Sequence, residues 1–391
     1  FSFIMGAHQR LKVGVLTSSR ADYGIYRPLL GKMSEDNAFD LEVIAFGTHL
    51  MKKFGHTVDA IYEDGFSVQP VHGTMSERDS PTDIAYAMSS TIRAFADFYK
   101  EHRYDILFAL GDRYEMFSAV AASVPFNMDV AHIHGGETTL GAIDNSFRHS
   151  ITHFSLFHFT AAEDYKSRVV KMLGRRSGVY NVGALSIDAI KNLRLLQLDE
   201  FNVKYGFDIS KPTILFTFHP ETIAYQRNEH HISEIINAIL KLNQYQFLIT
   251  MPNADTAGMI IRDALIRRLA GRANVKIIEN LGSRDYLSAM KHCSFLMGNT
   301  SSGFIEALFF SKPVINLGKR QKGRIETPNI ITVDIDEGSI LKAVKKVDSL
   351  SKIVLKPIYG DGTAASKIIR ILKNQYQSNR NYLEYIQEAS S

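Results

Sequence analysis

The residues best suited to chemistry gather in one stretch, VAHIHGGETTLGAIDNSFRHS at positions 130–150. It places His132, His134, Glu137 and Asp144 around two consecutive glycines. Imidazoles and carboxylates at this spacing are compatible with a metal site, with an acid/base site, or with a polar loop that has no chemical role.

A metal site is the weakest of these three interpretations. A metal ion needs three or four converging ligands, and the H-x-H at His132 and His134 supplies only two. The sequence has no H-E-x-x-H stretch, and the next three histidines are expected on a helix or on the following strand. We therefore expect no metal and no cofactor. Burial and neighbouring charges can instead tune such groups for proton transfer.

A second polar motif, GDRYE at 111–115, ends the apolar run YDILFAL. An ionised Asp112–Arg113 pair does not suit a hydrophobic core, because burying charges is costly. A structural pair and a functional pair both remain compatible with this sequence. In open parallel sheets, ligands bind outside the carboxyl ends of the strands, which is where both polar motifs are expected to lie.

A third motif, GNTSSGFIEALFF at 298–310, places three hydroxyl residues between a strand end and an expected helix. The free N–H groups and dipole of a helix N-terminus suit a phosphate, although ordinary helix capping gives the same pattern. KRQKGR follows the next strand, so Arg320 could pair with a diphosphate. Neither G-x-x-x-x-G-K-[ST] nor G-x-G-x-x-G occurs in the chain.

The elements that must position these motifs alternate between strand and helix. In the first half the strand-like runs are KVGVLTSS, FDLEVIAFG, YDILFALG, MDVAHIHGG and, last, VYNVGALSIDAI, and a helix is expected at about Ser146–Thr152. The alternation restarts with TILFTFHP, QFLITMPN, VKIIEN, SFLMGN, PVINLG and NIITVD. This order predicts an α/β fold with helix-covered parallel sheets. We expect an N-terminal domain at 11–195, a C-terminal domain at 211–360 and terminal helices at 361–391.

The composition excludes several classes of partner. The formal net charge is +4 over 391 residues and no run of five basic residues occurs, so neither nucleic acid nor a membrane surface is expected. Cys293 is the only cysteine, which excludes a disulfide within the chain. No apolar stretch reaches the roughly 20 residues of a membrane span. The expected compartment is the cytoplasm.

Taken in order, these segments resemble the hydrolysing UDP-N-acetylglucosamine 2-epimerases of sialic acid and legionaminic acid synthesis. The resemblance runs from about Lys12 to Leu372 and is carried by TSSRADYG, GTHL, GDRYE, HIHGGE, GAIDNSFRHSIT, HPET, PNAD, GNTSSGFIEA, KPVINLGKRQKGR and IYGDGTA. It implies a glycosyltransferase-B-type fold, with two Rossmann-like domains facing each other across a cleft. It also implies a UDP-sugar substrate, UDP as a product, and a homodimer or homotetramer.

The resemblance also implies site residues. UDP would be held mainly by the second domain, and the positions matching the family's contacts are Arg20, Arg113, His219, Asn253, Leu281, Thr300, Ser301, Glu306 and Arg320. In the family, a glutamate one turn into a helix holds the ribose, and Glu306 is expected there. The catalytic candidates are Asp112, Glu137 and Asp144, supported by His49, His132 and His134.

The family reaction removes UDP and the C2 proton to give a 2-acetamidoglucal, and water then adds to release the free manno sugar. The leaving diphosphate needs cations and N–H donors. Two positions depart from relatives: some have glutamate where this chain has His134, and others have serine where it has Gly24. Both positions are expected near the sugar. UDP-2,4-diacetamido-2,4,6-trideoxyglucose is therefore an alternative to UDP-N-acetylglucosamine.

Three other functions fit the same architecture. A non-hydrolysing 2-epimerase usually reads H-V-E-A-G-L-R at the HIHGGE position, which disfavours it. A glycosyltransferase has no use for so many carboxylates, and a non-catalytic nucleotide-sugar binder does not need Asp112 and Asp144. The sequence therefore predicts a hydrolysing 2-epimerase that converts UDP-N-acetylglucosamine to UDP and N-acetylmannosamine.

Overall fold

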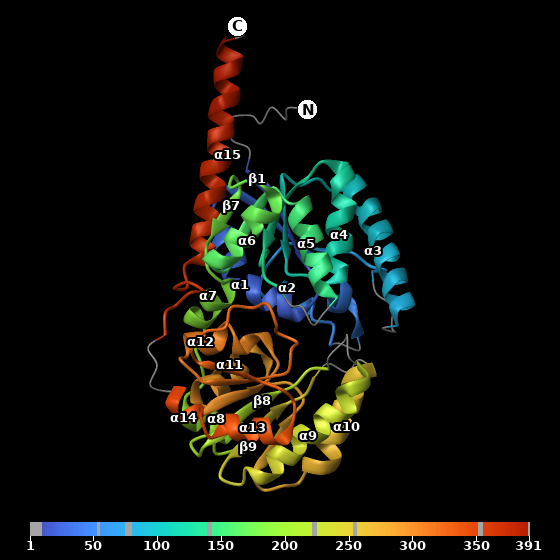
Figure 1. The fold of residues 1–391 in the computed structure, drawn as a ribbon. Helices are drawn as coiled ribbons and strands as arrows, with labels where there is room; N and C mark the ends of the chain where they lie inside the picture. The colour runs from blue at the N-terminus through green and yellow to red at the C-terminus, as the bar shows by residue number, and fades with distance from the viewer. Residues whose placement is uncertain are drawn as a thin grey trace. The chain divides into compact units, whose positions relative to one another are not determined.

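The computed structural model describes residues 10–52, 55–74, 80–138, 143–220, 225–252, 256–350 and 355–389 (Figure 1). These residues form two compact units. The first holds the described chain up to Gly136, Ser146–Lys191, and the described chain from Ile358 onward. The second holds Glu137–Asn145 and Asn192–Pro357.

The first unit is built on a seven-stranded parallel sheet in the order β3-β2-β1-β4-β5-β6-β7. Its strands are β1 Leu11–Thr17, β2 Phe39–Ala45, β3 Val68–Pro70, β4 Ile106–Leu110, β5 Asp129–Ile133, β6 Phe157–Thr160 and β7 Val179–Asn181. The helices are α1 Arg20–Ser34, α2 Asp59–Glu63, α3 Pro81–Glu101, α4 Tyr114–Ser123, α5 Asp144–Phe154, α6 Glu163–Leu173, α7 Leu185–Asn192 and α15 Ala364–Ala389, with 3-10 turns η1 Gly47–Leu50 and η3 Val124–Phe126.

Both faces of this sheet are covered, because successive strand residues point to opposite sides. Val13, Val15 and Phe108 pack against α1, α2, α7 and α15. Leu16 and Leu107 face α3, α4 and α5 instead. This double covering explains why these strands read as continuous apolar runs.

The second unit repeats the plan with six parallel strands in the order β10-β9-β8-β11-β12-β13. The strands are β8 Thr213–Thr217, β9 Gln246–Thr250, β10 Val275–Ile278, β11 Phe295–Gly298, β12 Val314–Leu317 and β13 Ile330–Val333. The helices are α8 Leu198–Tyr205, α9 Asn228–Lys241, α10 Thr256–Leu269, α11 Gly282–His292, α12 Glu306–Phe309, α13 Glu337–Val344 and α14 Val347–Leu350, with 3-10 turns η4 Tyr225–Arg227 and η5 Ser301–Gly303. One core joins the sheet to α9, α10 and α13, and another joins it to α8, α11 and α12.

Two parallel α/β sheets of this kind confirm the predicted fold class. The prediction for VYNVGALSIDAI was wrong in part, because β7 ends at Asn181 and α7 begins at Leu185. Gly183 makes the turn between them at a φ of +94°, and a Cβ there would lie 2.9 Å from the Tyr359 carbonyl oxygen. Only glycine adopts such a position without strain.

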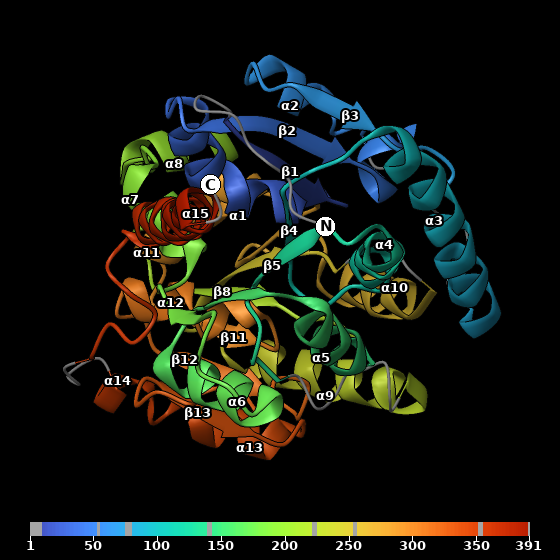
Figure 2. The ribbon, with the colours of Figure 1, turned by 90° about the horizontal axis from the view of Figure 1, so that it is seen from above.

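The last helix, α15, packs against α1 of the first unit, and Figure 2 shows it end-on. Ala364, Ala365 and Ile368 of α15 are buried in the same core as Leu29 of α1. The carboxylate of Asp188 accepts the backbone N–H groups of Ala364 and Ala365, at 3.0 and 2.9 Å. Asp188 therefore satisfies donors that the first turn of a helix leaves unpaired.

We expect Asp188→Ala to lower the free energy of unfolding by about 1–2 kcal/mol, because two N–H groups of α15 lose their buried acceptor. Urea denaturation measures the change. Asp263→Ala, at an exposed position within α10, is the matched control and should change the free energy by less than about 0.5 kcal/mol. Equal stability of the two variants would contradict the capping role.

Candidate functional site

The strand order of each sheet reverses once, between β1 and β4 in the first unit and between β8 and β11 in the second. In open α/β sheets, ligands bind at this reversal, outside the carboxyl ends of the strands. Arg20 follows β1, and Asp112 and Arg113 follow β4. In the second unit, His219 follows β8 and Thr300 follows β11. Each reversal therefore carries residues that the sequence singled out.

Asp112 forms an ion pair with Arg148 of α5, within the first unit. The Arg148 side chain is only 3% exposed, whereas that of Asp112 is 22% exposed. The second arm of the same guanidinium donates to the carbonyl oxygen of His134, at 2.8 Å. Arg148 therefore fixes the ends of β4 and β5 together and leaves the outer side of the Asp112 carboxylate accessible.

Arg148 is absent from the sequence-based set of candidates, although it lies within the GAIDNSFRHSIT motif. An arginine one turn into a helix that follows a strand-end loop was the available signal. The sequence is compatible with a structural pair between Asp112 and its neighbour Arg113. In the structure, Asp112 pairs with Arg148, and Arg113 donates to Glu115 at 2.7 and 3.2 Å.

His132 is fully buried on β5, with both ring nitrogens hydrogen-bonded. Nε2 lies 2.8 Å from the carbonyl oxygen of Gly111, which can only accept, so Nε2 carries the proton. Nδ1 lies 3.1 Å from the Thr152 hydroxyl. Burial lowers the pKa of His132 to about 3, so the imidazole is neutral at pH 7.

His49 has the same character. Its ring nitrogens lie 2.9 Å from the Thr17 hydroxyl and 2.8 Å from the Thr57 hydroxyl. Burial lowers the pKa of His49 to about 4. Both His49 and His132 are therefore neutral groups that hold strand ends in place.

His134 takes a left-handed conformation at a φ of +64° and is 7% exposed. Its backbone N–H donates to the Phe159 carbonyl oxygen at 3.2 Å. Two glycines follow, and a Cβ at Gly136 would lie 2.4 Å from the Tyr165 carbonyl oxygen. Gly136 therefore allows the loop to lie directly on α6.

Two arginines at the first reversal face different surroundings. Arg20 is exposed at the first position of α1. Arg113 pairs with Glu115, which is 1% exposed, and this carboxylate raises the pKa of Arg113 further above its usual range. The Arg113 side chain is 42% exposed, so a buried anion fixes it while part of its surface stays available to a ligand.

At the second reversal, the predicted helix after GNTSSG is shorter than expected. Thr300 caps the 3-10 turn η5, its hydroxyl accepting the Ser302 N–H at 3.4 Å, and α12 spans only Glu306–Phe309. Glu306 is therefore the first residue of its helix and not one turn inside it. Ser311 takes a left-handed conformation at a φ of +52° and Pro313 follows, so the helix cannot continue past Phe310.

Asn299 connects three parts of the second unit. Its amide accepts the His219 N–H at 2.7 Å and donates to the His219 carbonyl oxygen at 2.8 Å. Its own carbonyl oxygen accepts from Gln321, whose side-chain oxygen accepts from Arg324, both at 2.7 Å. Arg324 donates in turn to Glu137 at 2.6 Å. None of Asn299, Gln321 and Arg324 was among the predicted site residues.

The remaining candidates lie around this network. His219 has its pKa lowered to about 3 by burial and by the positive charge of Arg320. Leu281 is buried and precedes α11. Asp144 is the half-buried first residue of α5. Asn253 lies outside the described residues.

The two units divide the predicted catalytic residues. Asp112, His132, His134 and His49 belong to the first unit. Glu137 belongs to the second, as does Asp144, although the rest of α5 from Ser146 onward belongs to the first. Most of the UDP candidates also belong to the second unit. Within the described part of the chain, no group of three or more His, Cys, Asp or Glu residues could hold a metal ion.

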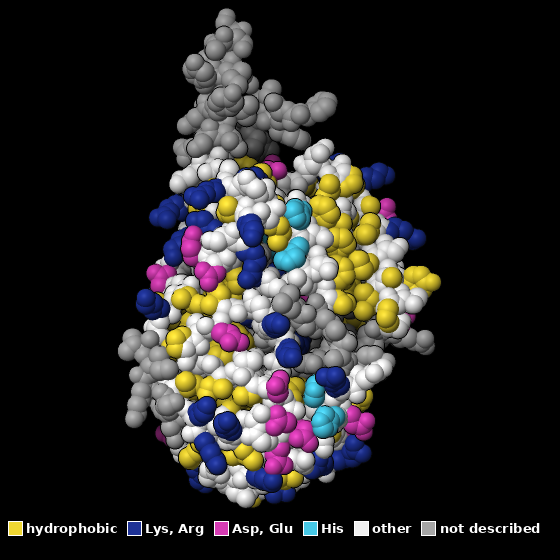
Figure 3. Space-filling view, viewed as in Figure 1, with side chains coloured by type: hydrophobic (Ala, Val, Ile, Leu, Met, Phe, Trp, Pro, Cys, Tyr) yellow, Lys and Arg dark blue, Asp and Glu magenta, His cyan; other side chains and the backbone are white. Residues whose placement is uncertain are grey.

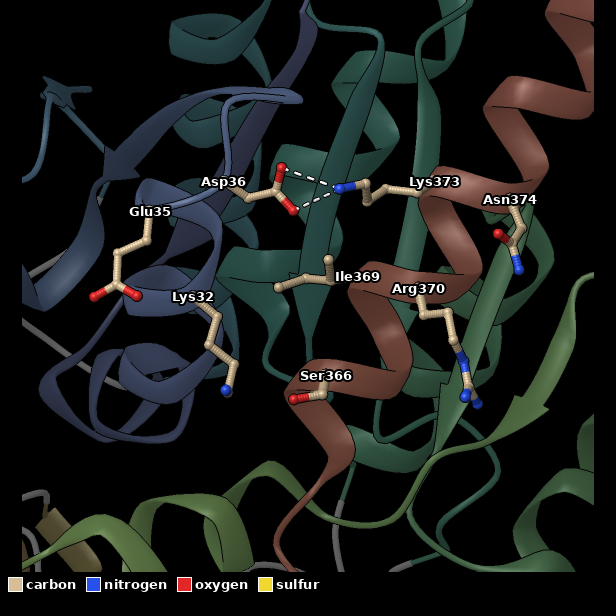
Figure 4. Close-up of a pocket in the computed structure, with 8 residues that line it drawn as sticks. All are labelled: Lys32, Glu35, Asp36, Ser366, Ile369, Arg370, Lys373 and Asn374. Atoms are coloured by element: carbon tan, nitrogen blue, oxygen red, sulfur yellow. Dashed lines mark hydrogen bonds and ion pairs between the residues drawn. The ribbon is translucent and has the colours of Figure 1, made fainter.

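A hollow of about 540 Å³ lies between α1 and α15 (Figure 4). Lys32 and Asp36 line it at the end of α1, and Lys373 of α15 pairs with Asp36 at 2.8 Å. Since α1 starts at the carboxyl end of β1, its last turn lies at the opposite edge of the sheet. The hollow is therefore separate from the strand reversal.

Two Rossmann-type sheets with polar loops at their reversals define a glycosyltransferase-B-like α/β protein. A UDP-GlcNAc 2-epimerase crystal structure from Neisseria meningitidis, bound to UDP-GlcNAc, matches with a TM-score of 0.81 at 17% identity, covering 93% of this chain and 100% of that one. A Methanocaldococcus jannaschii UDP-GlcNAc 2-epimerase matches with a TM-score of 0.76 at 17% identity, covering the same shares. These likenesses support the fold.

The sequence comparisons give the family. The family model for UDP-N-acetylglucosamine 2-epimerase matches residues 31–373, so the chain belongs to this family. The polysialic acid biosynthesis protein P7 of Escherichia coli is 33% identical, over 96% of this chain and 97% of the relative. The hydrolysing UDP-N,N'-diacetylbacillosamine 2-epimerase of Legionella pneumophila is 32% identical, over 93% and 95%. In the described part of the chain, no helix could cross a membrane.

We expect Arg148→Met to lower the free energy of unfolding by about 2–4 kcal/mol, because Asp112 and the His134 carbonyl lose a buried cation. Urea denaturation measures the loss. Arg176→Met is the control, because Arg176 is exposed and its side chain forms no hydrogen bond or ion pair with the described residues. A loss as small as that of the control would show that Arg148 does not join the two strand ends.

The buried His132 predicts a pH dependence. The unfolded chain binds a proton at His132 below pH 6.5 and the folded chain only near pH 3, so its contribution to stability is complete above pH 6.5 and declines below it. Replacing His132 by Asn should reduce the slope of unfolding free energy against pH by about 1.4 kcal/mol per unit between pH 6 and 4. Urea denaturation at several pH values measures the slope. The exposed His153→Gln should leave it unchanged.

Proposed function

We propose that this protein is a hydrolysing 2-epimerase that converts UDP-N-acetylglucosamine to UDP and N-acetylmannosamine. The observation that carries the proposal is Asp112, held by buried Arg148 at the strand reversal of a chain in this family. Two relatives at 32 and 34% identity, both named as hydrolysing 2-epimerases, support the hydrolysing type. The HIHGGE sequence, in place of H-V-E-A-G-L-R, also favours the hydrolysing type.

Most of the proposed UDP contacts lie in the second unit. Arg320, Thr300 and Ser301 of the second unit bind the diphosphate, and Glu306 binds the ribose. Cations and N–H donors there stabilise the negative charge that develops on UDP as it leaves. Arg20 and Arg113, the cations of the first reversal, are also proposed UDP contacts. Leu281, His219 and Asn253 complete the proposed UDP set.

The chemistry then follows in two balanced steps. In the first, the bond between C1 and the UDP oxygen breaks, a carboxylate takes the C2 proton, and a C1=C2 double bond forms. In the second, a protonated carboxyl gives its proton to C2 from the opposite face, water adds its oxygen to C1, and the proton that this water loses passes to the carboxylate just formed. Asp112 and Asp144 are the proposed acid/base pair, since a general acid and a general base are both needed. The neutral His132 holds the Gly111 carbonyl oxygen, next to Asp112, and the neutral His49 holds Thr17 at the end of β1.

The names of two similar proteins favour a second candidate substrate. Two relatives named as N,N'-diacetylbacillosamine 2-epimerases, from Legionella pneumophila and Campylobacter jejuni, are 32 and 34% identical. A Neisseria meningitidis protein named as a UDP-N-acetylglucosamine 2-epimerase is 26% identical. UDP-2,4-diacetamido-2,4,6-trideoxyglucose is therefore the second candidate substrate.

Chromatography of the UDP released from UDP-N-acetylglucosamine, from the diacetamido nucleotide sugar and from UDP-glucose tests which of them is a substrate. We expect UDP release from UDP-N-acetylglucosamine, and a higher kcat/KM for the diacetamido sugar would make that sugar the substrate. UDP-glucose, which lacks the acetamido group, is the control. Release of UDP from none of the three would contradict the proposed function.

We expect Asp112→Asn and Asp144→Asn to abolish turnover while UDP affinity stays within about tenfold, or ~1.4 kcal/mol. Each change removes a proton-transfer group but keeps the size of the side chain. Calorimetric titration with UDP measures the affinity. Asp40→Asn, exposed on β2, is the control. If either site variant keeps wild-type turnover, that residue does not transfer the proton.

We also propose a homo-oligomer. Figure 3 shows apolar side chains gathered on the surface over α3, α4 and α5. Exposed apolar residues of α3 and α5 include Tyr86, Ile92 and Phe154. Large exposed apolar patches mark interaction surfaces. Sedimentation velocity should give a dimer or tetramer that Ile92→Glu weakens by at least about tenfold. A monomeric wild-type protein would contradict this proposal.

A further inference from the structure

Three hydroxyl groups lie in a row at the loop that follows β11. The phenol oxygen of Tyr286, on α11, is 2.8 Å from Ser302 Oγ, and Ser302 Oγ is 3.2 Å from Thr300 Oγ1. Thr300 Oγ1 also accepts the backbone N–H of Ser302, at 3.4 Å. Each hydroxyl has one hydrogen to donate and can also accept, so the hydrogen bonds of the row can run in either direction.

The phenol of Tyr286 is anchored at the inner end of this row. Its half-buried ring packs against the core that joins the sheet to α8, α11 and α12. Burial raises the pKa of Tyr286 to about 12, so the phenol keeps its proton at neutral pH. The side chain of Thr217, the last residue of β8, also forms a hydrogen bond with this phenol. The phenol oxygen can therefore accept from Thr217 and donate its single hydrogen to Ser302.

A diphosphate bound at Thr300 sets the direction of the row. The oxygens of an ionised diphosphate only accept hydrogen bonds, so Thr300 must give its hydrogen to the ligand. Thr300 Oγ1 then accepts from the Ser302 hydroxyl, whose oxygen in turn accepts from Tyr286. The bonds run from the interior of the unit toward the ligand, and each one polarises the next.

We infer that Tyr286 is a positioning residue that acts through Ser302 to orient the Thr300 hydroxyl toward the diphosphate of UDP. The inference rests on the proposed function, because it takes the contact between Thr300 and the diphosphate from there. Neither Tyr286 nor Ser302 is among the proposed UDP contacts. Without the phenol, the Ser302 oxygen loses this donor, and the Thr300 hydrogen can turn inward to Ser302 instead of toward the ligand.

Calorimetric titration with UDP tests this role. Tyr286→Phe keeps the packed ring and removes only the hydroxyl, and it should raise the UDP Kd and the KM by about three- to tenfold, the range of one net hydrogen bond. The kcat should stay within about threefold, because the diphosphate is held both before and during the reaction. Tyr205→Phe is the matched control, since its phenol donates to Asp285 of the same unit at 2.6 Å, and it should leave the UDP Kd unchanged.

A double-mutant cycle tests the path through Ser302. In a Ser302→Ala background the row is already broken, so Tyr286→Phe should change the UDP Kd by less than about twofold. Two results would overturn the inference. One is a UDP Kd in Tyr286→Phe equal to that of the wild type. The other is the same loss of affinity with and without the Ser302 hydroxyl, because the phenol would then act by another route.

The UDP titration does not depend on turnover, so two failures can be told apart. If the wild type releases UDP from a nucleotide sugar but Tyr286→Phe binds UDP as tightly as the wild type, the inference fails and the proposed function stands. If Tyr286→Phe weakens UDP binding through Ser302 but the wild type releases UDP from no sugar, the proposed function fails and the positioning role of Tyr286 stands.

Discussion

The arrangement of the first reversal depends on one buried cation, Arg148. A guanidinium that is 3% exposed must have its charge compensated, and Asp112 supplies the compensation from the end of β4. The other arm of the guanidinium takes the carbonyl oxygen of His134, at the end of β5. Two neighbouring strand ends are thereby fixed relative to each other, and a carboxylate is held where a ligand could meet it. The neutral imidazole of His132, between the same two strand ends, contributes without adding a charge.

In the second unit, the side-chain amides of Asn299 and Gln321 hold the strand ends. Asn299 fixes the end of β8 through the His219 backbone, and Gln321 connects Asn299 to Arg324. Here too a buried guanidinium ends on a carboxylate, that of Glu137. Each network thus combines an arginine, a carboxylate and a backbone group held by side-chain hydrogen bonds. Such networks are stabilising only when every member is satisfied, which makes their positions well defined.

Much of the fold follows from the sequence, because apolar runs such as ILFAL and TILFT have the length of strands in a sheet covered on both faces. In the structure both runs are parallel strands that are buried throughout. The end of β7 was missed because SIDAI is apolar enough for either a strand or a short helix, and Gly183 decides between them through a contact with Tyr359. The short α12 was missed because the sequence pattern of a capped helix does not show how soon it ends.

The sequence predicts that the site residues lie at strand ends, but it does not predict which side chains form ion pairs with one another. Residues that are distant in sequence, such as Arg20 and Asp112, follow the two strands at which the strand order reverses. Each of them follows an apolar run, and this made each one recognisable from the sequence. Arg148 and Arg324 were missed because their roles come from partners 36 and 187 residues away. Neighbouring residues in the sequence, such as Asp112 and Arg113, suggested a pair that the structure does not contain.

The central claim is that this chain removes UDP and the C2 proton from its substrate and adds water. Proton NMR in deuterated water with UDP-N-acetylglucosamine, and separately with its 2,4-diacetamido-6-deoxy analogue, tests this most directly. The account predicts free UDP and a manno-configured sugar that carries deuterium at C2. A manno sugar that still carries UDP, or a released sugar that keeps its original C2 proton, would contradict it.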